Sequence, residues 1–298
     1  PQVSLHSVTP SHINLCFATH FYPLGSCTMK YNPKRNERVA RMPGFSDLHP
    51  YQPEDTLQGM LQLLYELQEY LQEISGLPAC SLQPAAGAHG ELTALWVAAA
   101  YFRDRGEKRT KVLVPDSAHG TNPASATMAG FETVTVKTLS TGTLDMDDLR
   151  RLLEDQIPVF MITNPNTCGL FEPDMKAISD AVHAVGGFVY CDGANFNAIV
   201  GKVRPGDLGI DAMHINLHKT FSTPHGGGGP GSGPVVLSSA LSPYAPLPFE
   251  AETSDGRLQL VEEENAGEEH PKAFGRMVAF HGQTGMFTRA LAYILCHG

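Results

Sequence analysis

Lys219 is the residue whose surroundings point most directly to covalent chemistry. It lies in NLHKTFSTPHGGGGPGSGP, residues 216–234, between a short apolar run and a run of glycines that no helix or strand interior would tolerate. Such a lysine is either an ordinary surface charge or a reactive amine. An amine becomes a nucleophile only when it is partly neutral, and lowering its pKa from about 10.4 to about 7 or 8 takes roughly 3 to 5 kcal/mol of environmental bias. Schiff-base chemistry explains that cost more easily than structure does.

Asp192 makes the reactive amine the better interpretation. It ends the apolar run GFVYCD, upstream of Lys219. A carboxylate at the end of a buried strand is costly unless it is paired, although a helix cap or a turn would also explain it. Together, an acid at one strand end and a lysine at another fit a pyridoxal phosphate site. There the amine forms an imine with the cofactor aldehyde, and the acid pairs with the ring nitrogen.

Three further motifs would complete such a site. PAAGAHGEL places Gly87, Ala88 and His89 at the start of a predicted helix, where backbone N–H groups favour a phosphate dianion. A tight turn is the alternative reading of these glycines. His119, in DSAHGTNP, is either a hydrogen-bonded loop histidine or a ring stacked on the cofactor. Asn195 follows Asp192 closely enough to reach the phenolic oxygen of the cofactor ring.

The remaining polar residues near Lys219 support weaker hypotheses. His214 and His218 stand four apart in a predicted strand, but without an H-E-x-x-H pattern, so we predict no metal site. The glycines 226–229 cannot form a Walker loop, because the lysine precedes them, and we expect them to let the chain turn sharply. Thr220 could place a hydroxyl near the phosphate.

Short apolar runs that alternate with helical patterns position these residues. Helical periodicity covers 56–75 and 90–106. Further along, strands are predicted at 111–116, 132–138, 158–165, 187–194, 211–218 and 233–239, and helices at 122–130, 145–155 and 174–186. This order predicts an α/β fold with a mainly parallel, mixed sheet covered by helices on both faces. In such sheets ligands bind at the carboxyl ends of the strands, where the polar loops of the candidate site fall.

We divide the chain into three parts. Residues 1–55, rich in Pro, Gly, Ser, His and Asn, are predicted to form an extended N-terminal arm, and residues 56–285 a large cofactor-binding domain. Residues 286–298 would begin a C-terminal domain that is otherwise missing. The abrupt ends therefore indicate a fragment.

Composition excludes several classes of protein. The 298 residues carry a formal net charge of −10, and no stretch gathers enough Lys and Arg to bind nucleic acid. No apolar run is long enough to span a membrane, and no signal peptide is visible. Six cysteines without a C-x-x-C pair indicate scattered thiols rather than structural zinc. We therefore expect a cytoplasmic enzyme.

Six ordered motifs resemble the glycine decarboxylase P-protein family, in particular the cofactor-binding second subunit of its two-chain form. They are FYPLGSCTMKYNPK, LQPAAGAHGEL, VPDSAHGTNPASA, TNPNTCGLFE, YCDGANFNAI and the stretch around Lys219. The resemblance implies fold type I of the pyridoxal-phosphate enzymes, with the C-terminal small domain largely missing. It also implies catalytic roles for Lys219 as the imine-forming residue, Asp192 as the partner of the ring nitrogen and His119 as the stacking residue.

The same resemblance implies the wider contact set. The residues expected to hold pyridoxal 5′-phosphate are Gly87, Ala88, His89, His119, Asn166, Asp192, Asn195, Asn216, His218, Lys219 and Thr220. Ser26, Thr28 and Lys30, in the motif GSCTMK, are candidates for holding the carboxylate of the substrate.

The implied reaction is the oxidative decarboxylation of glycine, with transfer of the aminomethyl group to the lipoyl arm of the H-protein. The implied assembly is an α2β2 heterotetramer with subunit 1 of the P-protein. Two alternatives stay open. One is another fold-type-I reaction, such as cysteine desulfuration, amino-acid decarboxylation or retro-aldol cleavage. The other is a truncated structural homologue without catalysis.

Overall fold

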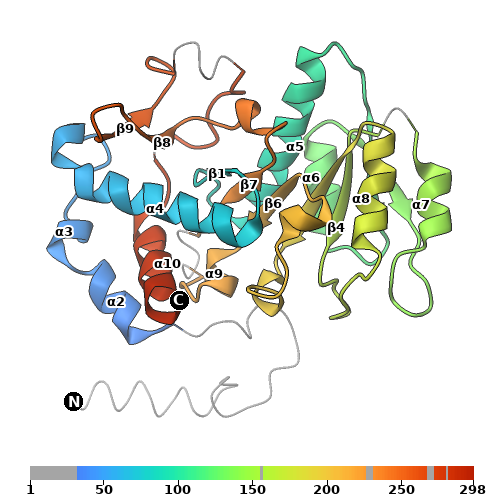
Figure 1. Ribbon diagram of the computed structural model, residues 1–298, viewed down its shortest axis with the longest axis horizontal. Coiled ribbons are helices and arrows are strands. Elements are labelled where there is room, and N and C mark those ends of the chain that lie inside the picture. The colour runs from blue at the N-terminus through green and yellow to red at the C-terminus, as the bar shows by residue number, and fades with distance from the viewer. Residues whose placement is uncertain (1–31, 155–156, 226–230, 267–271, 280) are drawn as a thin grey trace.

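A mixed sheet organises the molecule (Figure 1). The computed structural model describes residues 32–154, 157–225, 231–266, 272–279 and 281–298. Within them, a seven-stranded sheet has the order β1-β7-β6-β5-β4-β2-β3. Its strands are β1 (Ala79–Ser81), β2 (Lys111–Pro115), β3 (Glu132–Val136), β4 (Val159–Thr163), β5 (Phe188–Gly193), β6 (Ala212–Ile215) and β7 (Val235–Leu237). Strands β2 to β6 run parallel, whereas β7 is antiparallel to both β6 and β1. The predicted mainly parallel sheet is therefore confirmed.

Helices cover both faces of the sheet, as predicted. One face packs on α4 (Gln58–Ser75), α7 (Met146–Leu152), α8 (Met175–Ala184) and α10 (Thr284–His297). The other face packs on α5 (Gly87–Asp104) and α6 (Thr121–Met128). Shorter helices are α2 (Lys34–Ala40), α3 (Pro43–Ser46) and α9 (Leu217–Thr220), and the 3₁₀ turns are η2 (Glu54–Thr56), η3 (Phe196–Ala198), η4 (Pro205–Leu208) and η6 (Ser242–Tyr244).

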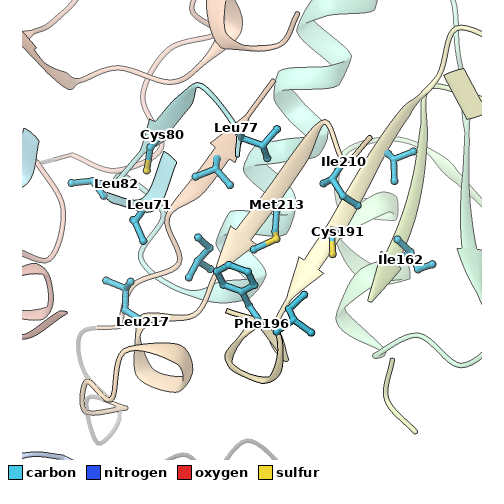
Figure 2. Packing of buried hydrophobic residues seen from close by; sticks show 14 of the residues in the cluster. Leu71, Leu77, Cys80, Leu82, Ile162, Cys191, Phe196, Ile210, Met213 and Leu217 are labelled. Carbon is cyan, nitrogen blue, oxygen red and sulfur yellow. The ribbon is translucent and has the colours of Figure 1, made fainter. Parts of the chain in front are cut away.

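Alternation along the strands explains how one sheet feeds two cores. On β4, Phe160 packs toward α4 and α8, whereas the next residue, Met161, packs toward α5 and α6. Figure 2 shows the first of these cores, with Met213 of β6 and Cys191 of β5 on the same face and Phe196 just beyond the end of β5. Because both faces are buried, the strands are almost continuously apolar.

The segment after β6 differs from its prediction. A strand was expected over 211–218, but β6 ends at Ile215 and α9 begins at Leu217. Asn216 stands between them in an extended conformation, and its side-chain amide is hydrogen-bonded to His214 on one side and His218 on the other. These contacts turn the chain, so His214 and His218 do not share a strand face.

Other elements were not predicted. Strand β1 has only three residues, and the hairpin β8 (Phe249–Glu252) and β9 (Leu258–Val261) mixes polar with apolar residues too irregularly to be recognised. The proposed arm lies outside the described residues up to position 31, and from there on it contains α2 and α3 rather than only extended chain. Helix α10 packs against α2 and α4 (Figure 1).

Candidate active site

A cavity of about 800 Å³ opens where the parallel strands end. The start of α5 and the loops after β2, β4, β5 and β6 contribute its walls. Eight of the residues proposed from the sequence line it: Gly87, Ala88, His119, Asp192, Asn195, Asn216, His218 and Lys219. Its volume lies in the range of pockets that hold small ligands and cofactors.

Asp192 is a buried carboxylate in the wall of this cavity, at 2% exposure. Its oxygens accept hydrogen bonds from the Asn122 amide at 3.0 Å and from the backbone N–H of Ala194 at 2.9 Å. Burial raises the pKa of the carboxyl, and attraction to His214 is the largest effect that lowers it. The two hydrogen bonds and the nearby Lys219 lower it further, so the pKa lies below the ordinary value of an aspartic acid.

A chain of side-chain contacts runs behind Asp192. His214 Nδ1 lies 2.5 Å from the hydroxyl of Tyr190, and its Nε2 lies 2.5 Å from Oδ1 of Asn216. Because that amide oxygen only accepts, Nε2 carries a proton. The same Nε2 is 3.5 Å from Oδ1 of Asp192. The carboxylate is thus backed by a fixed, proton-bearing ring rather than by mobile solvent.

Lys219 and His218 lie side by side in α9. The backbone N–H of Lys219 donates to the carbonyl of Asn216 at 3.0 Å, which holds the lysine against the cavity. Burial, followed by repulsion from His225 and Lys219, lowers the pKa of His218 to about 4. His218 is therefore neutral at pH 7, and its Nε2 faces the Asn216 amide nitrogen at 3.3 Å. The His218 imidazole therefore places no positive charge beside Lys219 at that pH.

The first turn of α5 approaches β6 more closely than a side chain would allow. A Cβ on Gly87 would lie 2.5 Å from Nδ2 of Asn216 and 3.1 Å from Nε2 of His214. On the neighbouring strand, a Cβ on Gly193 would lie 1.9 Å from the carbonyl oxygen of His214. Gly87 therefore lets the start of an 18-residue helix lie against the side chains of Asn216 and His214, and Gly193 lets β5 lie close to the backbone of β6.

His119 follows β2 and lines the cavity. Its Nδ1 lies 2.8 Å from the hydroxyl of Thr121, which donates to Oε1 of Glu91 at 2.8 Å. The other oxygen of Glu91 accepts from the hydroxyl of Ser125 at 3.1 Å. Glu91 is buried, at 3% exposure, and also lines the cavity.

Part of this site was not predicted from the sequence. Glu91, Thr121, Asn122 and Tyr190 were not proposed, and His214 was considered only as a metal ligand. Glu91 directly follows the glycine motif in PAAGAHGEL, and an acid in an otherwise apolar helix was a usable signal. Tyr190 had no such signal, because a tyrosine in a buried strand is ordinary.

Three proposed residues are not among those that line the cavity. His89 is turned back so that its Nδ1 accepts from the backbone N–H of Ala85 at 3.1 Å, although its backbone stays in the first turn of α5. The side-chain oxygen of Asn166 accepts from the backbone N–H groups of Cys168 and Leu170 in its own loop, and its amide donates to the carbonyl of Gly142 at 2.7 Å. Thr220 instead lines a second cavity of about 670 Å³, next to the last turn of α10.

Other predictions concern regions or properties outside this geometry. Ser26, Thr28, Lys30 and the glycines 226–229 lie outside the described residues. Across the described ranges, no cluster of three His, Cys, Asp or Glu side chains is placed to hold a metal ion. In the same part of the chain, no helix is both long and apolar enough to cross a membrane.

Comparison with known proteins decides the family. The profile of the family described as Glycine cleavage system P-protein matches residues 28–242. The chain belongs to this P-protein family. A probable glycine dehydrogenase (decarboxylating) subunit 2 of Caulobacter vibrioides is 55% identical over 300 residues, covering 100% of this chain and 57% of that protein. The protein of the same description from Rhodopirellula baltica is 54% identical, covering 98% of this chain and 59% of its own length.

Solved structures support the P-protein fold. A glycine decarboxylase (P-protein) of the glycine cleavage system, in inhibitor-bound form, matches with a TM-score of 0.76 and 20% identity, covering 100% of this chain and 66% of that one. A cysteine desulfurase of Escherichia coli matches with a TM-score of 0.63 and 18% identity, covering 92% and 68%. Fold type I is thereby confirmed, as is the resemblance to subunit 2. The chain spans about three fifths of the length of the curated relatives.

Proposed function

We propose that this chain carries the pyridoxal 5′-phosphate site of a glycine decarboxylase, in which glycine loses carbon dioxide and its aminomethyl group passes to the lipoyl arm of an H-protein. The observation that supports this most is the placement of Asp192 and Lys219 on one cavity, near enough for the lysine to lower the pKa of the acid. Membership of the P-protein family supports the choice of reaction, and the lining of the cavity supports the choice of residues.

The cavity fits the cofactor in three respects. It combines a buried acid, an amine and the first turn of a long helix, which are the three groups that the ring nitrogen, the aldehyde and the phosphate require. Gly87 leaves no Cβ between that turn and Asn216. In addition, Oγ1 of Thr163 is buried in the cavity wall without a hydrogen-bond partner in the described structure, directly beside Asp192 in the sheet register.

Lys219 and Asp192 would perform the central tasks. When bound, pyridoxal phosphate supplies an aldehyde that condenses with amines and a ring that accepts the electrons of a breaking bond at the α-carbon. Lys219 would hold the aldehyde carbon and give it up to the amine of glycine. Asp192, ionised and backed by His214, would keep a proton on the ring nitrogen.

The surrounding residues would orient the ligand. Backbone N–H groups of Gly87 and Ala88, at the positive end of α5, would hold the phosphate. His119 would lie against the face of the ring, and Asn195, whose amide donates to the carbonyl of Pro165 at 2.9 Å, would stand at its edge. His218, neutral at pH 7, adds no positive charge that would compete for Asp192.

The substrate and partners follow from family membership. The relatives are described as subunit 2 of a glycine dehydrogenase (decarboxylating), so we propose glycine as the substrate and a subunit 1 as the partner, in an α2β2 heterotetramer. We also propose that a lipoylated H-protein receives the aminomethyl group. Ser26, Thr28 and Lys30 remain our candidates for the glycine carboxylate.

The assignment of Lys219 is tested by Lys219→Ala. We expect this variant to lose the imine absorbance that appears when pyridoxal phosphate is added, because Lys219 is the one lysine among the described residues that line the cavity. Lys202→Ala, which removes an exposed lysine between β5 and β6, is the matched control and should keep the full absorbance. Borohydride reduction and peptide mapping should then label Lys219 in the unmodified protein.

An unchanged spectrum in Lys219→Ala, or label on another lysine, would overturn the assignment. The reaction itself is tested separately, by release of carbon dioxide from glycine. Release that depends on a lipoylated carrier supports the proposed reaction. Turnover of cysteine or of another amino acid would favour a different fold-type-I enzyme, and absence of any labelled lysine would favour a structural homologue.

A further inference from the structure

We propose that Glu91 and Thr121 are positioning residues that fix the proton of His119 on Nδ1, so that Nε2 faces the cavity as an acceptor. This inference rests on the proposed function only for the identity of the ligand that Nε2 would meet. The contacts that carry it lie entirely between residues of this chain.

The three side chains form a hydrogen-bonded series that runs from the buried Glu91 to the exposed His119. Glu91, in the first half of α5, is 3% exposed, whereas His119 is exposed at the cavity wall. Thr121, the first residue of α6, stands between them, and its hydroxyl is 2.8 Å from each neighbour. Packing of α5 against α6 fixes the separation of the two ends.

Only one placement of hydrogens satisfies both 2.8 Å contacts of the Thr121 hydroxyl. The Thr121 hydroxyl has a single hydrogen, and Oε1 of Glu91 accepts it. The hydroxyl therefore donates to Glu91, and its oxygen can only accept from His119. Two heavy atoms 2.8 Å apart need a hydrogen between them, so Nδ1 of His119 must carry it.

One further contact of His119 favours the tautomer that carries its proton on Nε2. The backbone N–H of Thr121 also points at Nδ1 of His119, at 3.3 Å, which would require a lone pair there. With that tautomer, the hydrogen of the Thr121 hydroxyl would have to point to Nδ1 of His119. The 2.8 Å contact between Thr121 and Glu91 would then have no hydrogen between its two oxygens. The 3.3 Å contact from the backbone N–H is weaker than the 2.8 Å hydrogen bond to Glu91, so the tautomer with the proton on Nδ1 is favoured.

Ser125 holds the carboxylate of Glu91 in one orientation. Its hydroxyl, from the next turn of α6, donates to the second oxygen of Glu91 at 3.1 Å. Both oxygens of the carboxylate are then engaged by α6. The hydrogen bond that one ring nitrogen makes decides which tautomer a histidine adopts. Nε2, the nitrogen that Thr121 does not engage, consequently offers its lone pair to an N–H, an O–H or a labile proton of a ligand.

The test is the tautomer of His119 in the protein without cofactor, measured by ¹⁵N spectra of the histidine-labelled chain. The chain has 13 histidines, and His119→Gln identifies the signals that belong to this residue. At a pH where the ring is neutral, we expect a protonated, pyrrole-type Nδ1 and an unprotonated, pyridine-type Nε2. The opposite pattern in the unmodified protein overturns the inference outright, whatever any variant does.

Three variants then separate positioning from general structure. Thr121→Val, which keeps the shape and removes the hydroxyl, should shift the Nδ1 signal toward the pyridine type and the Nε2 signal the other way. Thr121→Ser should restore the original pattern. Ser125→Ala, the matched control, removes the other hydroxyl on Glu91 and should leave the His119 signals in place. A Thr121→Val spectrum identical to that of the unmodified protein contradicts the proposal.

This readout is independent of the proposed function. Cofactor binding is followed by absorbance in the same samples. If the predicted tautomer is found but no cofactor binds, the function fails and the positioning role stands. If the cofactor binds but Nε2 carries the proton, the positioning role fails and the function stands.

Discussion

Two buried carboxylic acids in this molecule differ in their hydrogen-bond partners and in the charged groups around them. Asp192, on β5, is 2% exposed, and Glu250, on β8, is 4% exposed. Asp192 has hydrogen-bond donors at both oxygens and the rings and amine of the cavity around it. For Glu250, Oε1 is buried without a hydrogen-bond partner in the described structure, and burial raises the pKa of the carboxyl to about 8.

The difference shows what a buried acid needs in order to stay charged. Without partners, the cost of desolvation is avoided by keeping the proton, as Glu250 does at neutral pH. Asp192 stays ionised only because its donors are already in place before any ligand enters. In this molecule the acid whose pKa is lowered lies in the cavity wall among polar and charged groups, whereas the acid whose pKa is raised lies in the hairpin of β8 and β9.

The largest expected effect comes from Glu250→Gln and concerns pH. The unfolded chain releases this proton near pH 4.5, whereas the folded protein keeps it until about pH 8. Between these values the folded state binds more protons, so the free energy of unfolding falls as pH rises, by roughly 4 to 5 kcal/mol in total. Glu250→Gln should remove this loss, measured by urea unfolding at pH 5 and pH 8.

Glu252→Gln is the matched control, because it changes an exposed glutamate two residues away on the same strand. It should leave the dependence of stability on pH as it is in the unmodified protein. If Glu250→Gln and Glu252→Gln gave the same dependence, Glu250 would not be the neutral acid described above.

The next largest effect is expected for Asp192→Asn and concerns catalysis. An amide keeps the shape of the side chain but not its charge, so the cofactor should still bind while the proton on its ring nitrogen loses its partner. We expect glycine decarboxylation, assayed with a lipoylated carrier, to fall by about 10² to 10³-fold, as for removal of one preorganised electrostatic contact.

The exposed Asp207, in η4, provides the control for this change. Asp207→Asn carries the same loss of one negative charge and should retain full activity. Full activity in Asp192→Asn as well would remove the proposed role of the acid, even if the cofactor remained bound.

The architecture was predictable because burial on both faces leaves a strong pattern. Continuous apolar strands such as 159–163, separated by helices with regular periodicity, indicate a covered parallel sheet without any knowledge of contacts. Strand β1 and the hairpin β8–β9 escaped because they are short and partly polar. Their existence depends on neighbours that are remote in sequence, such as α4 for the hairpin.

The site was predictable to the extent that its residues follow strands directly. Asp192 lies at the end of β5, Lys219 in α9 shortly after β6, and His119 in the loop after β2, so topology alone brings them together. The supporting contacts were not predictable in this way. Glu91 reaches Thr121 across two helices, and the turn after β6 depends on which groups the Asn216 amide happens to meet. Such pairings are tertiary, and spacing along the chain does not encode them.

The smallest effect is expected for Tyr190→Phe, and it probes whether the support behind Asp192 is energetically real. Burial raises the pKa of Tyr190 well above its ordinary value, so the hydroxyl keeps its proton, and it lies 2.5 Å from Nδ1 of His214. Removing the hydroxyl leaves a buried ring nitrogen without that partner, which should lower the free energy of unfolding in urea by about 1 to 2 kcal/mol.

Tyr244→Phe is the control. The hydroxyl of Tyr244 donates to Asp104, which is partly exposed and keeps Lys272 as a partner, so the free energy of unfolding should fall by less than about 0.5 kcal/mol. Equal losses in the two variants would mean that the contact behind Asp192 contributes no more than a surface contact. The donors that keep Asp192 ionised would then have to be sought in Asn122 and the backbone alone.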